Sequence, residues 1–239
     1  NSHVHIEKFY EMDKNKSLVN KDNFVSSNNS NQNAIEIDEL NFKYFNSDEY
    51  IFENLNLDLK KNTHNILTGP NGSGKSTLLG LIAGVYYSQS GKVTTYSKNF
   101  GYIGAVPLIF SASLKDNILY GNDKTINDDE IIKFLKDFDT FKEESSYDLN
   151  RIIDNKSLSS GQMQKIAFIR ALLSDLDILL LDESTANLDD KSREYIFKTL
   201  RARKVTIINS THDPEKFLDI DSHFHIEIEN EKRIIIQKT

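Results

Sequence analysis

Nine residues at 69–77, GPNGSGKST, constrain the fold of this chain more than any other stretch of its sequence. They match the pattern G-x-x-x-x-G-K-[ST], whose glycines let the backbone wrap closely around phosphate groups. The preceding segment HNILTG at 64–69 reads as a short strand, and a helix is expected from Gly74 to about Val85. Because the motif requires a strand before it and a helix after it, we predict an α/β core with a phosphate site at this turn.

The positions of this phosphate loop have different expected roles. Lys75 is expected to bridge the β- and γ-phosphates of a nucleotide, and the Ser76 hydroxyl is expected to ligate Mg²⁺. The candidate nucleotide-binding residues are Gly69, Pro70, Asn71, Gly72, Ser73, Gly74, Lys75, Ser76 and Thr77.

A phosphate loop of this kind needs a second ligand for the metal and a group that acts on water. The stretch DILLLDE at 177–183 reads as a buried parallel strand, because it is continuously apolar, as a strand covered on both faces is. Asp182 at its end is the candidate metal ligand. Glu183, the next residue, is the candidate for orienting and polarising the attacking water.

A second anion-binding turn is predicted at 158–162, where LSSGQ opens directly into the amphipathic run MQKIAFIRALL. The N-terminus of such a helix points free backbone N–H groups and a helix dipole at a negative group. Taken alone, the turn is best explained as an ordinary serine N-cap. Together with the loop at 69–77, it raises the question of why one chain carries two such sites.

Composition excludes several classes of protein. The chain has 239 residues, which suffices for one large α/β domain or two small ones. Its formal net charge of -7 argues against a non-specific nucleic-acid binder, and the absence of cysteine excludes disulfides, thiolate metal sites and cysteine nucleophiles. The longest apolar runs, such as ILLL at 178–181, fall far short of the about 20 residues that span a bilayer.

The chain divides into a polar N-terminal segment and a globular remainder. Residues 1–33 are the least globular, and we expect a partly disordered linker there. Order is expected from Ala34, where alternating patterns predict antiparallel strands, and helical patterns cover about 111–173. The C-terminal end is predicted to form a hairpin that turns at Glu229–Glu231.

Taken together, GPNGSGKST, LSSGQ and DILLLDESTANLD resemble the nucleotide-binding domain of an ATP-binding-cassette (ABC) transporter, in order and in spacing, over residues 34 to about 236. The resemblance implies a phosphate-loop core with a mostly parallel sheet, an antiparallel β subdomain and a helical subdomain at about 111–173, all within a domain at 34–239. It also implies that two such domains pair head to tail around ATP and Mg²⁺. The second anion-binding turn then serves the ATP that the partner holds.

The resemblance assigns further site residues. Tyr44 in NFKYF matches the aromatic residue that stacks on adenine, and His212 in STHD matches the residue that contacts the γ-phosphate. Plainer interpretations are a core aromatic in a strand for Tyr44 and a surface or core histidine for His212. The turn implied at the partner's ATP comprises Leu158, Ser159, Ser160, Gly161 and Gln162, with Ser159 and the Gly161 backbone at the γ-phosphate. The residues implied to touch the partner across the dimer are Ala186, Leu188 and Asp189.

The chain also departs from the family pattern. Ala105 stands where the resemblance implies a glutamine that reaches Mg²⁺ and the water, and an alanine cannot ligate anything. Ser160 stands where the family mostly has glycine, so its Cβ is either tolerated or strains the turn. Nucleotide binding is expected to survive both changes, whereas coupling and turnover are in question.

The segment FSASLKDNILYG at 110–121 resembles exporter-type domains, as does the N-terminal run. This implies an ATP-hydrolysing motor domain on the cytoplasmic face of a membrane, with the transporter's transmembrane domains and a second nucleotide-binding domain as partners and no nucleic acid. Two alternatives stay open. Ala105 and Ser160 favour a regulatory module that binds ATP with impaired hydrolysis. A non-transport ABC ATPase acting on DNA or ribosomes is disfavoured by the acidic charge, the single phosphate loop and the lack of a coiled-coil insertion.

Overall fold

The computed structural model of the chain describes residues 32–45, 47–97, 99–122, 124–141, 147–230 and 232–238. The linker expected at 1–33 therefore lies almost entirely outside the described residues. Within the described part, no helix is both long enough and apolar enough to cross a membrane.

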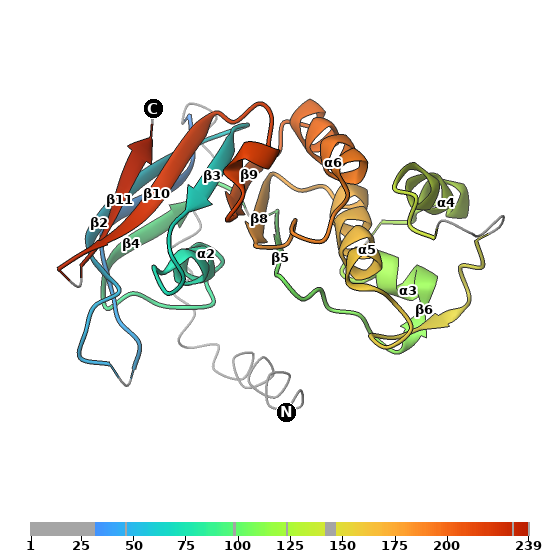
Figure 1. Cartoon of the computed structure of the whole chain (residues 1–239), viewed down its shortest axis with the longest axis horizontal. Helices are drawn as coiled ribbons and strands as arrows, with labels where there is room; N and C mark the ends of the chain where they lie inside the picture. The colour runs from blue at the N-terminus through green and yellow to red at the C-terminus, as the bar shows by residue number, and fades with distance from the viewer. Residues whose placement is uncertain are drawn as a thin grey trace.

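A six-stranded sheet forms the centre of the fold (Figure 1). In spatial order its strands are β11 (Lys232–Lys238), β10 (Ser222–Glu229), β3 (His64–Thr68), β9 (Thr206–Ser210), β8 (Ile178–Asp182) and β5 (Phe100–Ile103). Neighbouring strands from β10 to β5 run parallel, and β11 pairs antiparallel with β10 as the predicted C-terminal hairpin. The ends of the parallel strands therefore meet at one edge, which brings the loops after β3, β8 and β9 together.

The antiparallel portion predicted near the start of the chain is a separate three-stranded sheet. Its strands, in spatial order, are β2 (Phe52–Lys60), β1 (Asn33–Phe42) and β4 (Ser90–Thr95). The apolar face of β1, which includes Ile35 and Ile37, packs into one core with Leu78 and Leu79 of the helix α2 (Lys75–Ile82). This sheet thus fixes the helix that follows the phosphate loop.

The opposite end of the molecule is the helical portion (Figure 1). Its helices are α3 (Leu114–Leu119), α4 (Asp128–Asp137) and α5 (Ser160–Leu173). Their apolar faces form a second core, in which Phe138 and Phe168 are fully buried.

The prediction of a helical region at about 111–173 did not include one small feature. β6 (Ala112–Ser113) and β7 (Ile152–Ile153) pair antiparallel within that region, and the Leu114 N–H extends the pairing by donating to the Arg151 carbonyl at 2.9 Å. Strands of two residues are too short to produce a period-2 pattern, so the sequence gives no sign of them.

Two elements complete the fold after β8, the apolar strand that ends at Asp182. α6 (Asp190–Ala202) lies between β8 and β9, and the short helix predicted after Asp213 is the 3₁₀ turn η2 (Pro214–Lys216). The predicted α/β fold, with a mostly parallel sheet, an antiparallel β portion and a helical portion, is confirmed.

Candidate functional site

The phosphate loop joins β3 to α2. At two of its positions the backbone conformation favours glycine over any residue with a Cβ. Gly69 has φ 151°, and a Cβ there would lie 2.7 Å from both the Ile226 carbonyl oxygen and Ser73 Oγ. Gly74 caps α2 in the left-handed region at φ 101°. The strand, turn and helix that the motif requires are therefore all present.

The Lys75 ammonium folds back over this loop. Its Nζ donates to the carbonyl oxygens of Gly69 at 2.9 Å and Pro70 at 3.3 Å, and it lies 3.8 Å from Glu183 Oε1. The side chain is only 5% exposed, so its charge is held inside the loop. A buried cation that is satisfied mainly by carbonyl oxygens is well suited to exchange them for phosphate oxygens.

The two candidate metal ligands meet across the site, because Ser76 Oγ donates to Asp182 Oδ1 at 3.0 Å. Two adjacent ligands of an octahedral Mg²⁺, each at about 2.1 Å, also lie about 3.0 Å apart. The described residues form no group of three or more His, Asp or Glu that could hold a metal ion by itself.

Glu183 and His212 form a pair beside this position. The distance between His212 Nε2 and Glu183 Oε1 is 2.9 Å, and the Glu183 N–H donates to the Ser210 carbonyl at 3.1 Å. Glu183 itself adopts a left-handed conformation at φ 52°, which is uncommon for a residue with a Cβ. Parallel pairing of β8 with β9 thus brings together two residues that the sequence separates.

A small cavity of about 180 Å³ opens next to this pair. Glu183, His212 and Ala105 are among the residues that line it. The main chain at Ala105 is tied to the helical portion, since Gln164 Nε2 donates to the Ala105 carbonyl at 3.5 Å. Ala105 therefore contributes to the wall of this cavity beside Glu183.

The LSSGQ turn is a helix N-terminus, as predicted. Ser159 caps α5 in a capping box, in which its side chain accepts from the Gln162 N–H while Gln162 Oε1 accepts from the Ser159 N–H. Ser160 is the first residue of α5 and has ordinary helical geometry, so its Cβ causes no backbone strain. α2 lies against the sheets, whereas α5 runs through the helical portion, so the two N-termini belong to different parts of the fold (Figure 1).

The loop after β8 is fixed against α5. A Cβ on Gly161 would lie 3.0 Å from the Asn187 carbonyl oxygen, and the Asp189 carboxylate pairs with Lys165 at 2.7 Å. Burial raises the pKa of Asp189, but hydrogen bonds from Lys165 and Ser192 outweigh it and hold that pKa at about 2. Leu188 is buried beneath the same loop. The turn and the predicted dimer loop are therefore in direct contact.

Tyr44 lies beside the helix that follows the phosphate loop. Its hydroxyl is 2.7 Å from Thr77 Oγ1, and its ring meets Phe42 and Tyr86 edge-on at centroid distances of 5.2 and 5.6 Å. The side chain is 41% exposed, so part of the ring is free to stack on a base.

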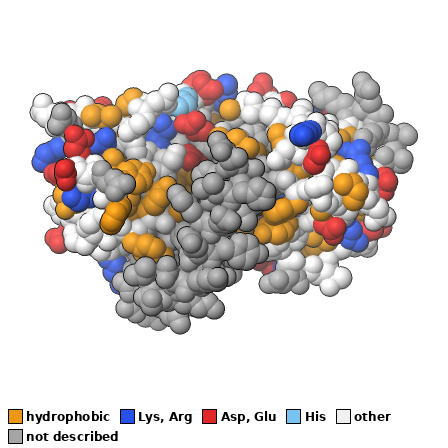
Figure 2. All heavy atoms as spheres, turned by 90° about the horizontal axis from the view of Figure 1, so that it is seen from below, with side chains coloured by type: hydrophobic (Ala, Val, Ile, Leu, Met, Phe, Trp, Pro, Cys, Tyr) orange, Lys and Arg blue, Asp and Glu red, His pale blue; other side chains and the backbone are white. Residues whose placement is uncertain are grey.

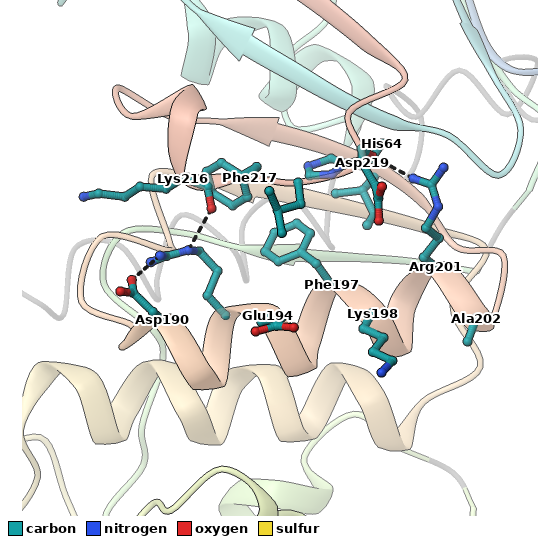
Figure 3. A pocket seen from close by; sticks show the side chains of 13 residues that line it. His64, Asp190, Glu194, Phe197, Lys198, Arg201, Ala202, Lys216, Phe217 and Asp219 are labelled. Carbon is teal, nitrogen blue, oxygen red and sulfur yellow. Dashed lines mark hydrogen bonds and ion pairs between the residues drawn. The ribbon is translucent and has the colours of Figure 1, made fainter.

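A larger cavity, of about 730 Å³, lies between α6 and the segment after β9 (Figure 3). Residues of the candidate nucleotide site do not line it, although its wall includes Arg193, Lys216 and Phe217, which also border the small cavity. The larger cavity is therefore next to the candidate site but separate from it.

Comparisons with known proteins agree with this geometry. The family model described as ABC transporter matches residues 52–186. The chain is 36% identical over 180 residues to ABC transporter B family member 1 of Dictyostelium discoideum, covering 69% of this chain and 20% of that protein. It is 32% identical over 201 residues to the ATP-dependent lipid A-core flippase of Pseudoalteromonas translucida, covering 77% of this chain and 35% of that protein.

A solved structure of a bacterial Atm1-family ABC exporter with ATP bound has the same fold, with a TM-score of 0.73 at 22% identity. The match covers 87% of this chain and 39% of that one. The chain spans about a fifth to a third of the length of the two curated relatives. Since the family model covers more than half of its residues, the chain belongs to the ABC transporter family, as an ATPase domain.

Proposed function

We propose that the chain is the motor domain of an ABC exporter, and that two such domains close head to tail around two MgATP and separate after hydrolysis. The observation that carries the proposal is a convergence at one sheet edge. Within it, Ser76 lies 3.0 Å from Asp182, Lys75 lies 3.8 Å from Glu183, and Glu183 lies 2.9 Å from His212. These are the groups that hold phosphates, hold a metal and act on water in phosphoryl transfer.

Each residue has one task in the proposed reaction. Residues 69–77 hold the phosphates, Lys75 neutralises charge on the β- and γ-phosphates, and Ser76 with Asp182 holds Mg²⁺. When bound, Mg²⁺ neutralises charge on the phosphate oxygens. Glu183 orients and polarises a water, whose oxygen bonds to the γ-phosphorus as the bond to the bridging oxygen breaks. His212 contacts the γ-phosphate and is hydrogen-bonded to Glu183, so catalysis is mainly positioning and charge stabilisation.

The second helix N-terminus completes the site of a partner in this proposal. Residues 158–162 face the partner's ATP, with Ser159 and the Gly161 backbone at the γ-phosphate, and Tyr44 stacks on adenine in its own domain. The location of α2 and α5 in different parts of the fold supports this, because the α5 N-terminus is then available to a neighbour (Figure 1).

The proposed site of the transmembrane domains is an exposed apolar surface beside β6 and β7. Val106 is 82% exposed and Ile152 is 70% exposed, while Tyr120 packs on Phe110 at a centroid distance of 4.5 Å. Hydrophobic side chains are also plainly exposed on the face that Figure 2 shows. Apolar surfaces of this kind mark protein interfaces. The domain would then lie on the cytoplasmic face of the membrane.

Phosphate release from MgATP, measured together with sedimentation of the chain, tests the proposal. Hydrolysis with an ATP-dependent shift from monomer to dimer is expected. Tight ATP binding without phosphate release would instead support the regulatory alternative, which Ala105 favours.

The variant Ala105→Gln tests whether the missing glutamine side chain lowers the rate of ATP hydrolysis. Ala105 lines the small cavity beside Glu183, so a glutamine there would bring an amide to the wall of that cavity. We expect a severalfold higher rate of phosphate release with unchanged ATP affinity. Val106→Gln is the matched control, because that neighbour is exposed and does not line the cavity. An unchanged rate in Ala105→Gln would show that the site is complete without a side chain here.

A further inference from the structure

One oxygen of the Asp182 carboxylate is held by a residue to which the motifs assign no role. The Tyr102 hydroxyl donates to Asp182 Oδ2 at 2.9 Å, while the Ser76 hydroxyl donates to Oδ1 at 3.0 Å. Tyr102 lies in β5, which pairs in parallel with β8 and places Tyr102 opposite Leu180. The carboxylate is therefore held at both oxygens, by donors from two different elements.

The two hydroxyls differ in what metal binding does to them. Ser76 Oγ and Asp182 Oδ1 are the two atoms proposed to ligate Mg²⁺, so their mutual hydrogen bond is replaced when the metal is bound. The Tyr102 bond involves the other oxygen, so it can persist. It fixes the rotation of a carboxylate that stands at the end of a strand and is only partly buried.

We propose that Tyr102 is a positioning residue for the metal site, which orients the Asp182 carboxylate so that Oδ1 faces the Mg²⁺ of the bound nucleotide. The inference rests on the proposed function, since it requires a nucleotide-bound metal at Ser76 and Asp182. Hydrogen bonds to a ligating carboxylate contribute about 10- to 100-fold to metal affinity. The effect matters here because Ala105, in the wall of the neighbouring cavity, has no ligand to add.

Tyr102→Phe removes the hydroxyl and keeps the ring, which is 46% exposed and needs no repacking. The measurement is the affinity for a fluorescent ADP analogue, titrated with Mg²⁺ and repeated in EDTA. We expect the half-saturating Mg²⁺ concentration to rise about tenfold, while the affinity in EDTA stays within twofold of the parent. A merely structural role would lower both affinities together.

Tyr87→Phe is the control, because it removes a hydroxyl from a tyrosine that is 41% exposed and belongs to neither of the proposed sites. If the half-saturating Mg²⁺ concentration is the same in the parent and in Tyr102→Phe, the proposed role of Tyr102 is wrong and the proposed function stands. If Mg²⁺ has no effect on the parent, the metal site itself is wrong, and both proposals fail.

Discussion

Replacing Glu183 by glutamine is expected to lower ATP turnover by at least about 100-fold and to leave ATP binding intact. The amide has the size of the carboxylate but cannot accept a proton from water. Glu183 Oε1 lies 2.9 Å from His212 Nε2 and 3.8 Å from Lys75 Nζ, so the change removes a negative charge from between two basic groups. The phosphate contacts proposed for the loop at 69–77 are untouched, which is why binding should persist.

Phosphate release and ATP affinity, measured on the same preparations, check this expectation. Glu194→Gln is a matched control, since Glu194 is an exposed acid on α6 that lines the larger cavity (Figure 3). It should hydrolyse ATP as the parent does. A Glu183→Gln chain that turns over within a few-fold of the parent would refute the proposed role of Glu183.

The same Glu183→Gln chain also tests the head-to-tail arrangement. If hydrolysis separates the two domains, blocking it should trap the closed form, and sedimentation should show a dimer only with MgATP. Such a dimer would support the proposal that Ser159 faces a neighbour's nucleotide and that Ser160 is tolerated. A monomer that binds ATP without dimerising would mean that the transmembrane domains or a different partner are needed, or that the turn is impaired.

The parts of the site that could be predicted from sequence are those in which one short segment fixes its own geometry. GPNGSGKST requires a strand, a glycine turn and a helix, and all three are contiguous. LSSGQ contains both members of the Ser159–Gln162 capping box, so the helix start is also local. A buried parallel strand such as β8 can be predicted because its residues form a continuous apolar run.

The contacts that sequence could not predict depend on which strands and loops become neighbours. Tyr102 meets Asp182 because β5 pairs with β8 across about 80 intervening residues. Tyr44, just after β1, meets Thr77 in the helix α2 across about 30 residues of sequence. No local pattern predicts such a contact. The sequence around Tyr102 or Tyr44 would be the same if its hydroxyl were exposed to water.

Packing between residues distant in sequence also determines the surroundings of His64, a histidine at the start of the central strand β3. It is 5% exposed, its ring stacks on Phe197 at a centroid distance of 4.8 Å, and Phe217 meets it edge-on at 5.7 Å (Figure 3). Among the described residues, nothing hydrogen-bonds to its buried Nε2. Burial lowers the pKa of His64 from its ordinary 6.5 to about 4. The negative charge of Asp221 opposes this shift, and the positive charge of Arg201 adds to it.

This depressed pKa predicts that the free energy of unfolding falls in mildly acidic solution. Below pH 6.5 the unfolded chain takes up a proton at His64 and the folded chain does not, so stability decreases as the pH falls from 6.5 to about 4. The contribution of this one residue is a loss of about 2 kcal/mol at pH 5 and about 3 kcal/mol at pH 4, relative to pH 7. Denaturant unfolding followed by circular dichroism over this range measures it.

The variant His64→Val isolates the effect, because valine suits a buried strand and does not titrate. Its free energy of unfolding should change less than the parent's between pH 7 and pH 4, so the difference between the two proteins should shift by about 3 kcal/mol over this range, whatever its value at pH 7. His223, whose pKa is lowered by burial and by the nearby charges of Lys238 and His225, adds a loss common to both proteins that cancels in the comparison. Parallel curves would show that His64 has the same pKa in the folded and the unfolded chain, and would refute the lowered pKa.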